Sequence, residues 1–274
     1  MDKNKLKNAL PVIVLALFLI PIITSSVLDI RQERKVRQAQ QKLLAEETAR
    51  KLAEEKLYLL GKFEPAKRED FILIPAHYAN NGNQMYLRKE AYEAFMQMEQ
   101  AAELDGINLK IASATRNFYY QRDIWEKKWI GATLVDGENL SASLPEGSLR
   151  FKKILEYSAA PGTSRHHWGT DIDLNYAIPS YFETGRGKEI YDWLVINAPR
   201  FGFCQVYNAK DNARTTGYHE EKWHWSYLPL AKQFTEEYKN LITESDLTGF
   251  MGEEYLFGQN LINDYVLGIN PECL

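Results

Sequence analysis

Cysteine is scarce in this chain: only Cys204 and Cys273 occur among its 274 residues. So small a number excludes a disulfide-rich scaffold, and the wide separation excludes a metal knuckle built on cysteine pairs. At most one disulfide can form. The sequence leaves its presence open, because it does not show whether the two Cα atoms approach within the required distance of about 7 Å.

A strong excess of either charge is absent as well. The 33 basic and 37 acidic residues give a formal net charge of -4 at pH 7. Because nucleic-acid-binding domains carry concentrated positive charge, this balance predicts no nucleic-acid partner. With 45% hydrophobic residues, the chain can bury the core of one domain and is long enough for further segments.

Charged side chains are also missing from residues 8–28, which follow three lysines among the first seven residues. A helix of about 21 residues is about 30 Å long, the thickness of the hydrocarbon core. Small residues at positions 24–26 leave a cleaved signal peptide as the alternative, although its apolar part would be unusually long. We therefore expect residues 1–28 to be a single-pass membrane anchor, with the rest of the chain on the periplasmic or extracellular side. This orientation leans on the function inferred below, because basic residues flank both ends of the span.

Residues 29–62 contain no proline and one glycine, Gly61, and consist mainly of helix-favouring residues. They predict a long helical stalk. Apolar residues at a and d heptad positions would also allow two stalks to associate as a coiled coil, although Glu46 and Arg50 interrupt that seam. The heptad residues are Val36, Ala39, Leu43, Ala53, Leu57 and Leu60.

A change in composition near Pro65 marks the start of a globular domain, residues 63–274. Its mixture of strand-like and helical segments indicates an α+β fold. An apolar run at 71–74 follows the boundary, a strand is expected at 109–112, and helices are expected at 88–104, within 113–129, at 230–243 and at 253–267.

Two histidines and two aspartates lie close together in the segment PGTSRHHWGTDIDLN, residues 161–175. Imidazole and carboxylate groups suit zinc, and a catalytic zinc ion takes three protein ligands and leaves a fourth position for water. Gly169 permits a tight turn that would bring His166 and Asp173 to one metal ion.

The segment HEEKWHWSY, residues 219–227, supplies another imidazole and two carboxylates. His219 and His224 are five residues apart, so they do not match the helical zinc motif in which two histidines lie four apart. Aromatic residues at 223, 225 and 227 instead alternate with His224 and Ser226, which is the period of a strand with one buried face. We expect His224 to point into a cleft, with Glu221 just before the strand.

The pattern Ser164-x-His166-x-x-Gly169-x-x-x-Asp173, followed by Glu221-x-Trp223-His224, resembles the paired signature of the zinc D-Ala-D-Ala carboxypeptidases and dipeptidases. A third element, SATRNFYYQ from 113 to 121, resembles the upstream arginine segment of the same family. That family includes vancomycin-resistance carboxypeptidases and phage endolysin peptidases, and it shares a fold with lysostaphin-type enzymes and the Hedgehog signalling domain. The resemblance implies a small antiparallel sheet that carries a zinc site, with flanking helices.

The resemblance also implies a role for each matching residue. Zn²⁺ would be bound by His166, Asp173 and His224, and Glu221 would act as the general base. Arg116 would bind the scissile carbonyl oxygen or the substrate carboxylate. Gln121 and Ser164 would hydrogen-bond the substrate backbone or orient the ligands.

One position departs from the family pattern. Many members have a small residue two positions before the aspartate ligand, where this chain has Asp171. Asp171 would either support a metal-bound histidine or bind a substrate ammonium group. It is also a second candidate for the ligand role assigned to Asp173.

These residues lead to the hypothesis of a zinc-dependent D,D-carboxypeptidase that removes the terminal D-alanine from peptidoglycan stem peptides. A peptidoglycan endopeptidase with the same zinc chemistry is the first alternative. The long connection between Gln121 and Pro161 is expected to shape the rim of the cleft and so to decide between them. The second alternative is a non-catalytic, zinc-containing binding module of the envelope. Glu221 argues against it, because a structural zinc site needs no base.

Overall fold

A computed structural model of the chain describes residues 3–80, 82 and 84–274, with side chains from residue 31 onward apart from positions 81 and 83. The chain divides into two compact units, Met1–Glu54 and Glu55–Leu274. The second unit combines helices with small antiparallel sheets. The α+β fold class expected for the globular domain is therefore confirmed.

Helix α1 (Lys3–Leu59) contains most of the predicted stalk. The predicted anchor, residues 1–28, lies in the part of the chain whose side chains are not described. In the part of the chain that the structure describes, no helix is both long enough and apolar enough to span a membrane. Residues 31–54 are exposed, and ion pairs along the helix, such as Lys51 with Glu47 at 3.0 Å, support it.

The predicted heptad seam does not extend to Leu60. This residue is buried in the second unit together with Leu59, because both pack into an apolar core there. Gly61 follows at φ +72°, a left-handed conformation that ends a helix. A Cβ atom on Gly61 would overlap the His167 ring, so the glycine also allows close contact with the loop that carries this histidine. Self-association through the stalk stays a prediction.

The central sheet is antiparallel, with the strand order β3-β4-β6-β5. In the register between β4 and β6, Asp173 lies opposite His224 and Ile172 lies opposite Trp225. The four strands are β3 (Ile111–Ser113), β4 (Asp171–Leu174), β5 (Phe203–Gln205) and β6 (His224–Tyr227). A smaller antiparallel pair consists of β1 (Phe71–Leu73) and β2 (Tyr86–Arg88).

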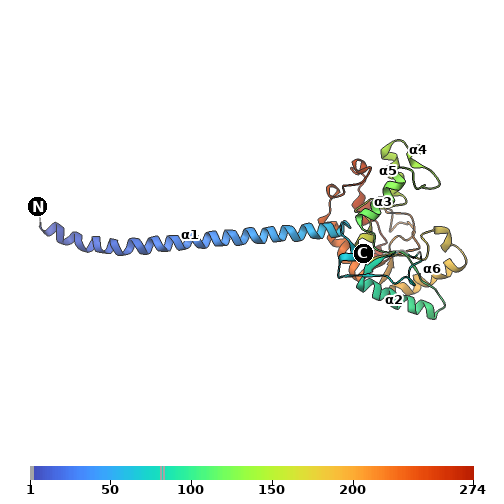
Figure 1. Cartoon of the computed structure of the whole chain (residues 1–274), viewed down its shortest axis with the longest axis horizontal. Helices are drawn as coiled ribbons and strands as arrows, with labels where there is room; N and C mark the ends of the chain where they lie inside the picture. The colour runs from blue at the N-terminus through green and yellow to red at the C-terminus, as the bar shows by residue number, and fades with distance from the viewer. Residues whose placement is uncertain (1–2, 81, 83) are drawn as a thin grey trace. The chain divides into compact units, whose positions relative to one another are not determined.

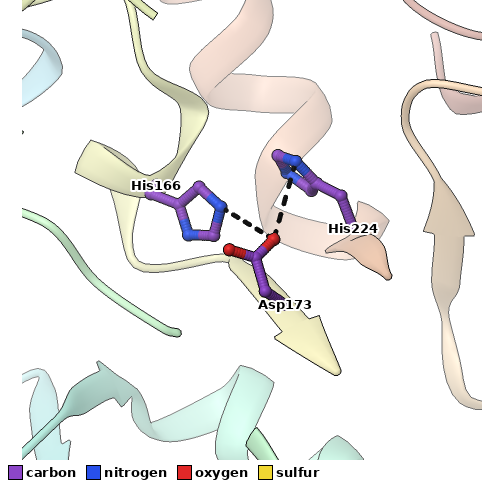
Figure 2. A group of neighbouring side chains, drawn as sticks. All are labelled: His166, Asp173 and His224. Atoms are coloured by element: carbon purple, nitrogen blue, oxygen red, sulfur yellow. Dashed lines mark ion pairs between the residues drawn. The ribbon is translucent and has the colours of Figure 1, made fainter. Parts of the chain in front are cut away.

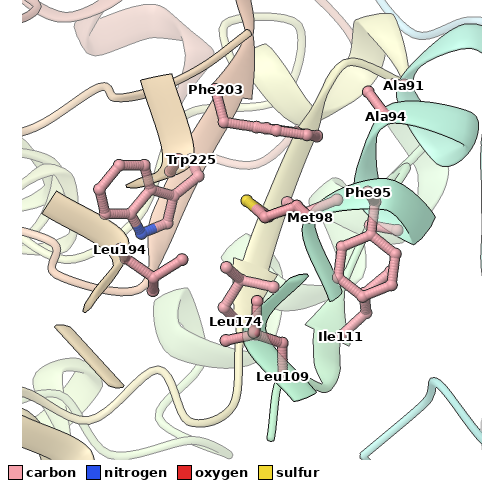
Figure 3. Close-up of a cluster of buried hydrophobic side chains, with 14 of the residues drawn as sticks. Ala91, Ala94, Phe95, Met98, Leu109, Ile111, Leu174, Leu194, Phe203 and Trp225 are labelled. Atoms are coloured by element: carbon pink, nitrogen blue, oxygen red, sulfur yellow. The ribbon is translucent and has the colours of Figure 1, made fainter. Parts of the chain in front are cut away.

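Side-chain alternation gives the central sheet one apolar face and one polar face. Ile172, Leu174 and Trp225 are buried with apolar residues of α2 (Lys89–Leu104) and α6 (Gly185–Asn197), as Figure 3 shows for part of this core. Residues of β4 and β6 that alternate with them are polar, and they lie on the opposite face. The predicted alternation of aromatic residues with His224 is thus confirmed for β6.

A second apolar cluster lies on the other side of this unit. Figure 1 shows α2 and α6 on one side and α3, α4 and α5 on the other. The helices not yet given bounds are α3 (Phe118–Trp129), α4 (Leu140–Ser143), α5 (Gly147–Leu155) and α7 (Leu228–Leu241). The long connection expected between Gln121 and Pro161 contains the rest of α3, then α4 and α5, with turns and irregular segments between them. Short turns complete the fold: η1 (Pro65–Lys67), η2 (Arg165–Trp168), η3 (Pro179–Phe182), η4 (Ala198–Phe201), η5 (Glu244–Asp246) and η8 (Pro271–Cys273).

The C-terminal part differs from its prediction. The helix expected at 253–267 is wrong, because only η6 (Glu253–Tyr255) and the π-helix η7 (Ile262–Val266) form there. Gly258 and Asn260 interrupt the segment with φ values of +81° and +48°, which a right-handed helix does not tolerate. A disulfide joins Cys204 on β5 to Cys273, with the Cα atoms 5.8 Å apart. It ties the end of the chain to the sheet.

Candidate metal centre and active site

Three separate elements bring His166, Asp173 and His224 together. His166 lies on η2, Asp173 on β4, and His224 begins β6. Gly169 ends η2 at φ +74°, and a Cβ atom there would overlap Phe71, so this turn requires glycine. One potential ligand atom from each of the three residues lies within 4.8 Å of the others (Figure 2). All three side chains are buried.

The polar atoms of His166 and Asp173 are arranged as if to hold a cation. His166 Nδ1 lies 2.8 Å from the Ala114 carbonyl oxygen, to which it donates in the matching tautomer. The lone pair of Nε2 is then directed at Asp173 Oδ1, 3.3 Å away. His166 Nε2 and Asp173 Oδ1 are both buried without a hydrogen-bond partner among the described residues. Two facing acceptors are unfavourable unless a proton or a metal ion lies between them, so this pair fits a metal ion.

The electrostatics of Asp173 agree with this arrangement. Burial raises the pKa of the carboxyl group, but the two imidazoles and the Arg116 guanidinium lower it to about 2. Arg116 Nη2 lies 3.8 Å from Asp173 Oδ2. Asp173 is therefore an anion at neutral pH, which is the form that binds a metal ion.

His224 lies between two carboxylates. Its Nδ1 is 2.9 Å from Glu221 Oε2, and its Nε2 is 3.0 Å from Asp171 Oδ1. Burial lowers the pKa of the ring, but the hydrogen bonds to Asp171 and Glu221 raise it to about 9. Nδ1 is the nitrogen that faces Asp173, at 3.9 Å, and it could bind a metal ion in place of its hydrogen bond to Glu221 while Asp171 holds Nε2.

Asp171 is completely buried and does not line the cavity described below, so it does not contact a substrate there. Each of its oxygens accepts two hydrogen bonds. Arg165 Nε and His224 donate to Oδ1, while Thr170 Oγ1 and Ser226 Oγ donate to Oδ2 at 2.6 and 3.0 Å. Burial raises its pKa, but Arg165 and His224 outweigh that effect and hold the pKa well below the usual range. Of its two expected roles, the geometry favours support of a histidine.

The loop that carries Arg116 is fixed to the two adjacent histidines. The Arg116 backbone N–H donates to the His166 carbonyl at 3.2 Å. The Arg116 carbonyl accepts from His167 Nδ1 at 2.6 Å, and His167 Nε2 accepts from the Gly162 N–H at 3.0 Å. Burial lowers the pKa of His167 to about 3, which keeps the ring neutral and able to make both bonds. His167 thus positions Arg116.

A cavity of about 270 Å³ opens beside these residues. Arg116, Gln121, Ser164 and Glu221 line it, so the structure brings all of the predicted site residues to one place. Gln121 Nε2 donates to the Ala159 carbonyl at 2.8 Å, while its Oε1 is buried without a partner among the described residues. The helix predicted from the sequence could also have revealed Lys128, which follows Gln121 by two turns and lies on the same face. Other lining residues that the sequence did not single out are Ile124, Tyr157, Ser158, Tyr207 and Tyr218.

The sequence is similar to a known family and to several known proteins. Residues 84–230 match the VanY family, described as D-alanyl-D-alanine carboxypeptidase. A D-alanyl-D-alanine carboxypeptidase of Enterococcus faecalis is 30% identical over 163 residues, which cover 57% of this chain and 55% of the relative. The putative carboxypeptidase YodJ of Bacillus subtilis is 26% identical over 198 residues, covering 69% of this chain and 61% of the relative. This chain thus spans just over half of the length of these curated relatives.

A solved structure is also similar. It is a mutant of the vancomycin resistance D,D-pentapeptidase VanY from a VanB-type resistance cassette, in complex with Zn(II). The sequence identity is 27%, the TM-score is 0.43, and the match covers 67% of this chain and 93% of that one. Because the family match extends over more than half of the sequence, this chain belongs to the VanY family of D-alanyl-D-alanine carboxypeptidases.

Proposed function

We propose that this chain is a zinc-dependent D,D-carboxypeptidase that removes the terminal D-alanine from peptidoglycan stem peptides. The observation that carries the proposal is the pair of buried, unpartnered ligand atoms, His166 Nε2 and Asp173 Oδ1, beside His224 and in the same cavity as Glu221. Family membership and the relative in Enterococcus faecalis support the substrate. The zinc complex of VanY supports the choice of metal.

The ligand set would consist of His166 through Nε2, Asp173 through Oδ1 and His224 through Nδ1. The other nitrogen of each histidine is already engaged, by the Ala114 carbonyl and by Asp171. Zinc held by these residues supplies a Lewis acid that polarises a carbonyl group and lowers the pKa of water toward about 7.

Glu221 is suited to move the proton. It would accept a proton from the attacking water and deliver it to the leaving amine, as a general base and then a general acid. Its backbone is fixed on both sides, because its N–H donates to the Tyr207 carbonyl and its carbonyl accepts from the His224 N–H. The side chain is partly exposed in the cavity and can therefore reach both water and substrate.

Arg116 is suited to stabilise the charge that develops on the scissile carbonyl oxygen. Its guanidinium lines the cavity, and its Nε is buried without a partner among the described residues. Gln121 Oε1 would accept a hydrogen bond from a substrate N–H, and the Ser164 hydroxyl would bind the substrate backbone. Both side chains line the same cavity.

The remaining parts of the proposal concern location. Residues 1–28 would anchor the chain in the membrane, residues 29–62 would form a stalk able to self-associate, and residues 63–274 would act on the periplasmic or extracellular side. Support comes from the uncharged stretch at 8–28. The Cys204–Cys273 disulfide also fits an oxidising compartment outside the cytoplasm.

The test is digestion of purified muropeptides by the zinc-loaded full chain in detergent, with products identified by mass spectrometry. The proposal predicts loss of one alanine from pentapeptides, abolished by a chelator and restored by zinc. Cleavage of cross-linked dimers or of internal stem bonds would identify an endopeptidase instead. The absence of any product from a zinc-loaded chain would favour a non-catalytic binding module.

A further inference from the structure

Helix α3 places a second positively charged side chain, Lys128, in the wall of the cavity, in addition to Arg116. Gln121, Ile124 and Lys128 follow one another at the spacing of a single helical face, and all three line the cavity that contains the potential metal ligands. Arg116 precedes this helix and lines the cavity too. Two positive side chains thus face a space of about 270 Å³.

Lys128 has no carboxylate partner among the described residues, although its side chain is partly buried. Its Nζ donates to the Ser158 hydroxyl, which is also in the cavity wall. Burial and the nearby Arg116 charge lower its pKa to about 8, although the Glu221 charge acts in the opposite direction. Withdrawing a charged group from water without a counter-charge is unfavourable. Carboxylates line the adjoining hollow, but none of those that the structure describes forms an ion pair with Lys128, so its ammonium group can still bind an anion that enters the cavity.

Neighbouring lysines are arranged differently. Lys127, on the same helix, pairs with Asp123 at 2.6 Å and is well exposed. Lys153 on α5 pairs with Glu156 at 2.8 Å. Both satisfy their charge within the chain, which makes the ammonium group of Lys128 unusual in this region.

The position of Lys128 identifies which part of a substrate it would meet. Its charge interacts with that of Glu221, the group proposed to protonate the leaving amine. The two residues also line an adjoining hollow together with Tyr157 and Trp223. Lys128 is therefore on the leaving-group side of the scissile bond. If the residue on that side has a free α-carboxylate, this carboxylate is attached to the same Cα atom as the leaving nitrogen.

We propose that Lys128, together with the Ser158 hydroxyl, forms the subsite for the free α-carboxylate of the residue on the leaving side of the scissile bond. This inference rests on the proposed function and narrows its substrate class. A terminal D-alanine supplies such a carboxylate, and so does a cross-bridge residue that keeps a free carboxylate beside the scissile bond. An internal stem bond, in which the next carboxyl group is already an amide, leaves Lys128 without its counter-charge.

The first experiment measures binding separately from hydrolysis. An acetylated peptide ending in D-Ala-D-Ala is prepared as the free acid and as the C-terminal amide, and each is titrated into the zinc-loaded Glu221→Gln chain. We expect the free acid to bind more tightly. Lys128→Gln, added to the same chain, should weaken acid binding by roughly 10- to 100-fold, the equivalent of one charge-assisted hydrogen bond, and leave amide binding unchanged.

Two matched variants separate this effect from a general change in charge or fold. Lys127→Gln removes a lysine from the adjacent position and should leave the ratio of acid to amide binding unchanged. Lys128→Arg keeps the positive charge and should restore part of the preference for the acid. An equal acid-to-amide ratio with and without Lys128→Gln would overturn the proposal, and so would failure of the acid to bind at all.

Hydrolysis then identifies the source of the carboxylate. With Glu221 intact, Lys128→Gln should raise the KM for the free-acid pentapeptide far more than it lowers kcat. Preference for pentapeptide monomers identifies terminal D-alanine, whereas preference for cross-linked dimers identifies the cross-bridge residue. If the acid binds through Lys128 but no peptide is hydrolysed, the proposed function fails while the carboxylate subsite stands.

Discussion

Asp171 tests how far the protein itself prepares the metal site. This carboxylate is buried, and it accepts a hydrogen bond from His224 Nε2 at 3.0 Å. Asp171→Asn keeps the size of the side chain and one acceptor oxygen, but it removes the negative charge. The histidine ring is then less firmly held, and its Nδ1 becomes a weaker donor to a metal ion. Loss of such a supporting carboxylate typically weakens metal binding by about 10- to 100-fold.

The structure also predicts a separate effect on stability. Arg165 is completely buried, and Asp171 is the anion beside it, with Nε and Oδ1 3.3 Å apart. Asp171→Ala would leave this guanidinium without a counter-charge, which costs about 3–5 kcal/mol for a buried pair. Combining Asp171→Ala with Arg165→Leu should restore most of the unfolding free energy. Zinc affinity should stay low in the double variant, because His224 still lacks its partner.

The assay is competition for zinc between the protein and a chromophoric chelator, with circular dichroism as a check on folding. Thr235→Ala serves as the control, because it removes a hydrogen bond from Arg165 at 3.0 Å but leaves Asp171 and His224 in contact. A zinc dissociation constant for Asp171→Asn equal to that of the unaltered chain would show that Asp171 does not support the metal site. Full recovery of zinc affinity in the double variant would also refute it, because Asp171 would then act through stability alone.

Three further predictions concern catalysis, the disulfide and pH. Glu221→Gln should keep zinc bound while peptide hydrolysis falls by orders of magnitude, whereas His224→Ala should lose metal and activity together. Metal analysis and rate measurements test both variants. Hydrolysis at the original rate by Glu221→Gln would contradict the assignment of Glu221 as the base. Replacing Cys273 by serine removes the disulfide that closes a loop with a sequence separation of 69 residues. In the chain-entropy model this should lower the unfolding free energy by about 4 kcal/mol. Denaturant titration measures the change, and an unchanged midpoint would contradict the prediction. Because the pKa of His224 is raised from 6.5 to about 9 in the folded, metal-free chain, its contribution to stability is complete below pH 6.5 and should be lost as the pH rises through 9. Denaturant titrations of chelator-treated protein test this, and constant stability across that range would show that Asp171 and Glu221 do not hold the proton.

Local sequence patterns were sufficient to predict the elements that carry the site. The alternation around His224 predicted a strand because apolar and polar side chains face opposite sides of a sheet, and β6 has this arrangement. Gly169 predicted the turn before Asp173 for an equally local reason. The grouping of the candidate ligands depended on spacing and family resemblance, which together identify residues but not the atoms that face one another.

The parts that sequence did not predict depend on contacts between distant segments. The partner of Asp171 became clear only when β6 placed His224 beside it. In the sequence Lys128 does not differ from the other lysines; the structure places it on the face of α3 that lines the cavity, with no ion pair to a carboxylate in the described part of the chain. Leu60 fits a heptad position but is buried in the domain core, because the apolar surface available there outweighs the periodicity of the stalk.

The most direct test of the proposed zinc-dependent activity is a zinc titration of the metal-free chain that records bound metal and alanine release from a pentapeptide in the same samples. We expect alanine release to rise in proportion to bound zinc until a single equivalent is bound, and we expect neither zinc binding nor release when His166 is replaced by alanine. Alanine release without zinc, or a full equivalent of bound zinc without any release, would contradict this expectation.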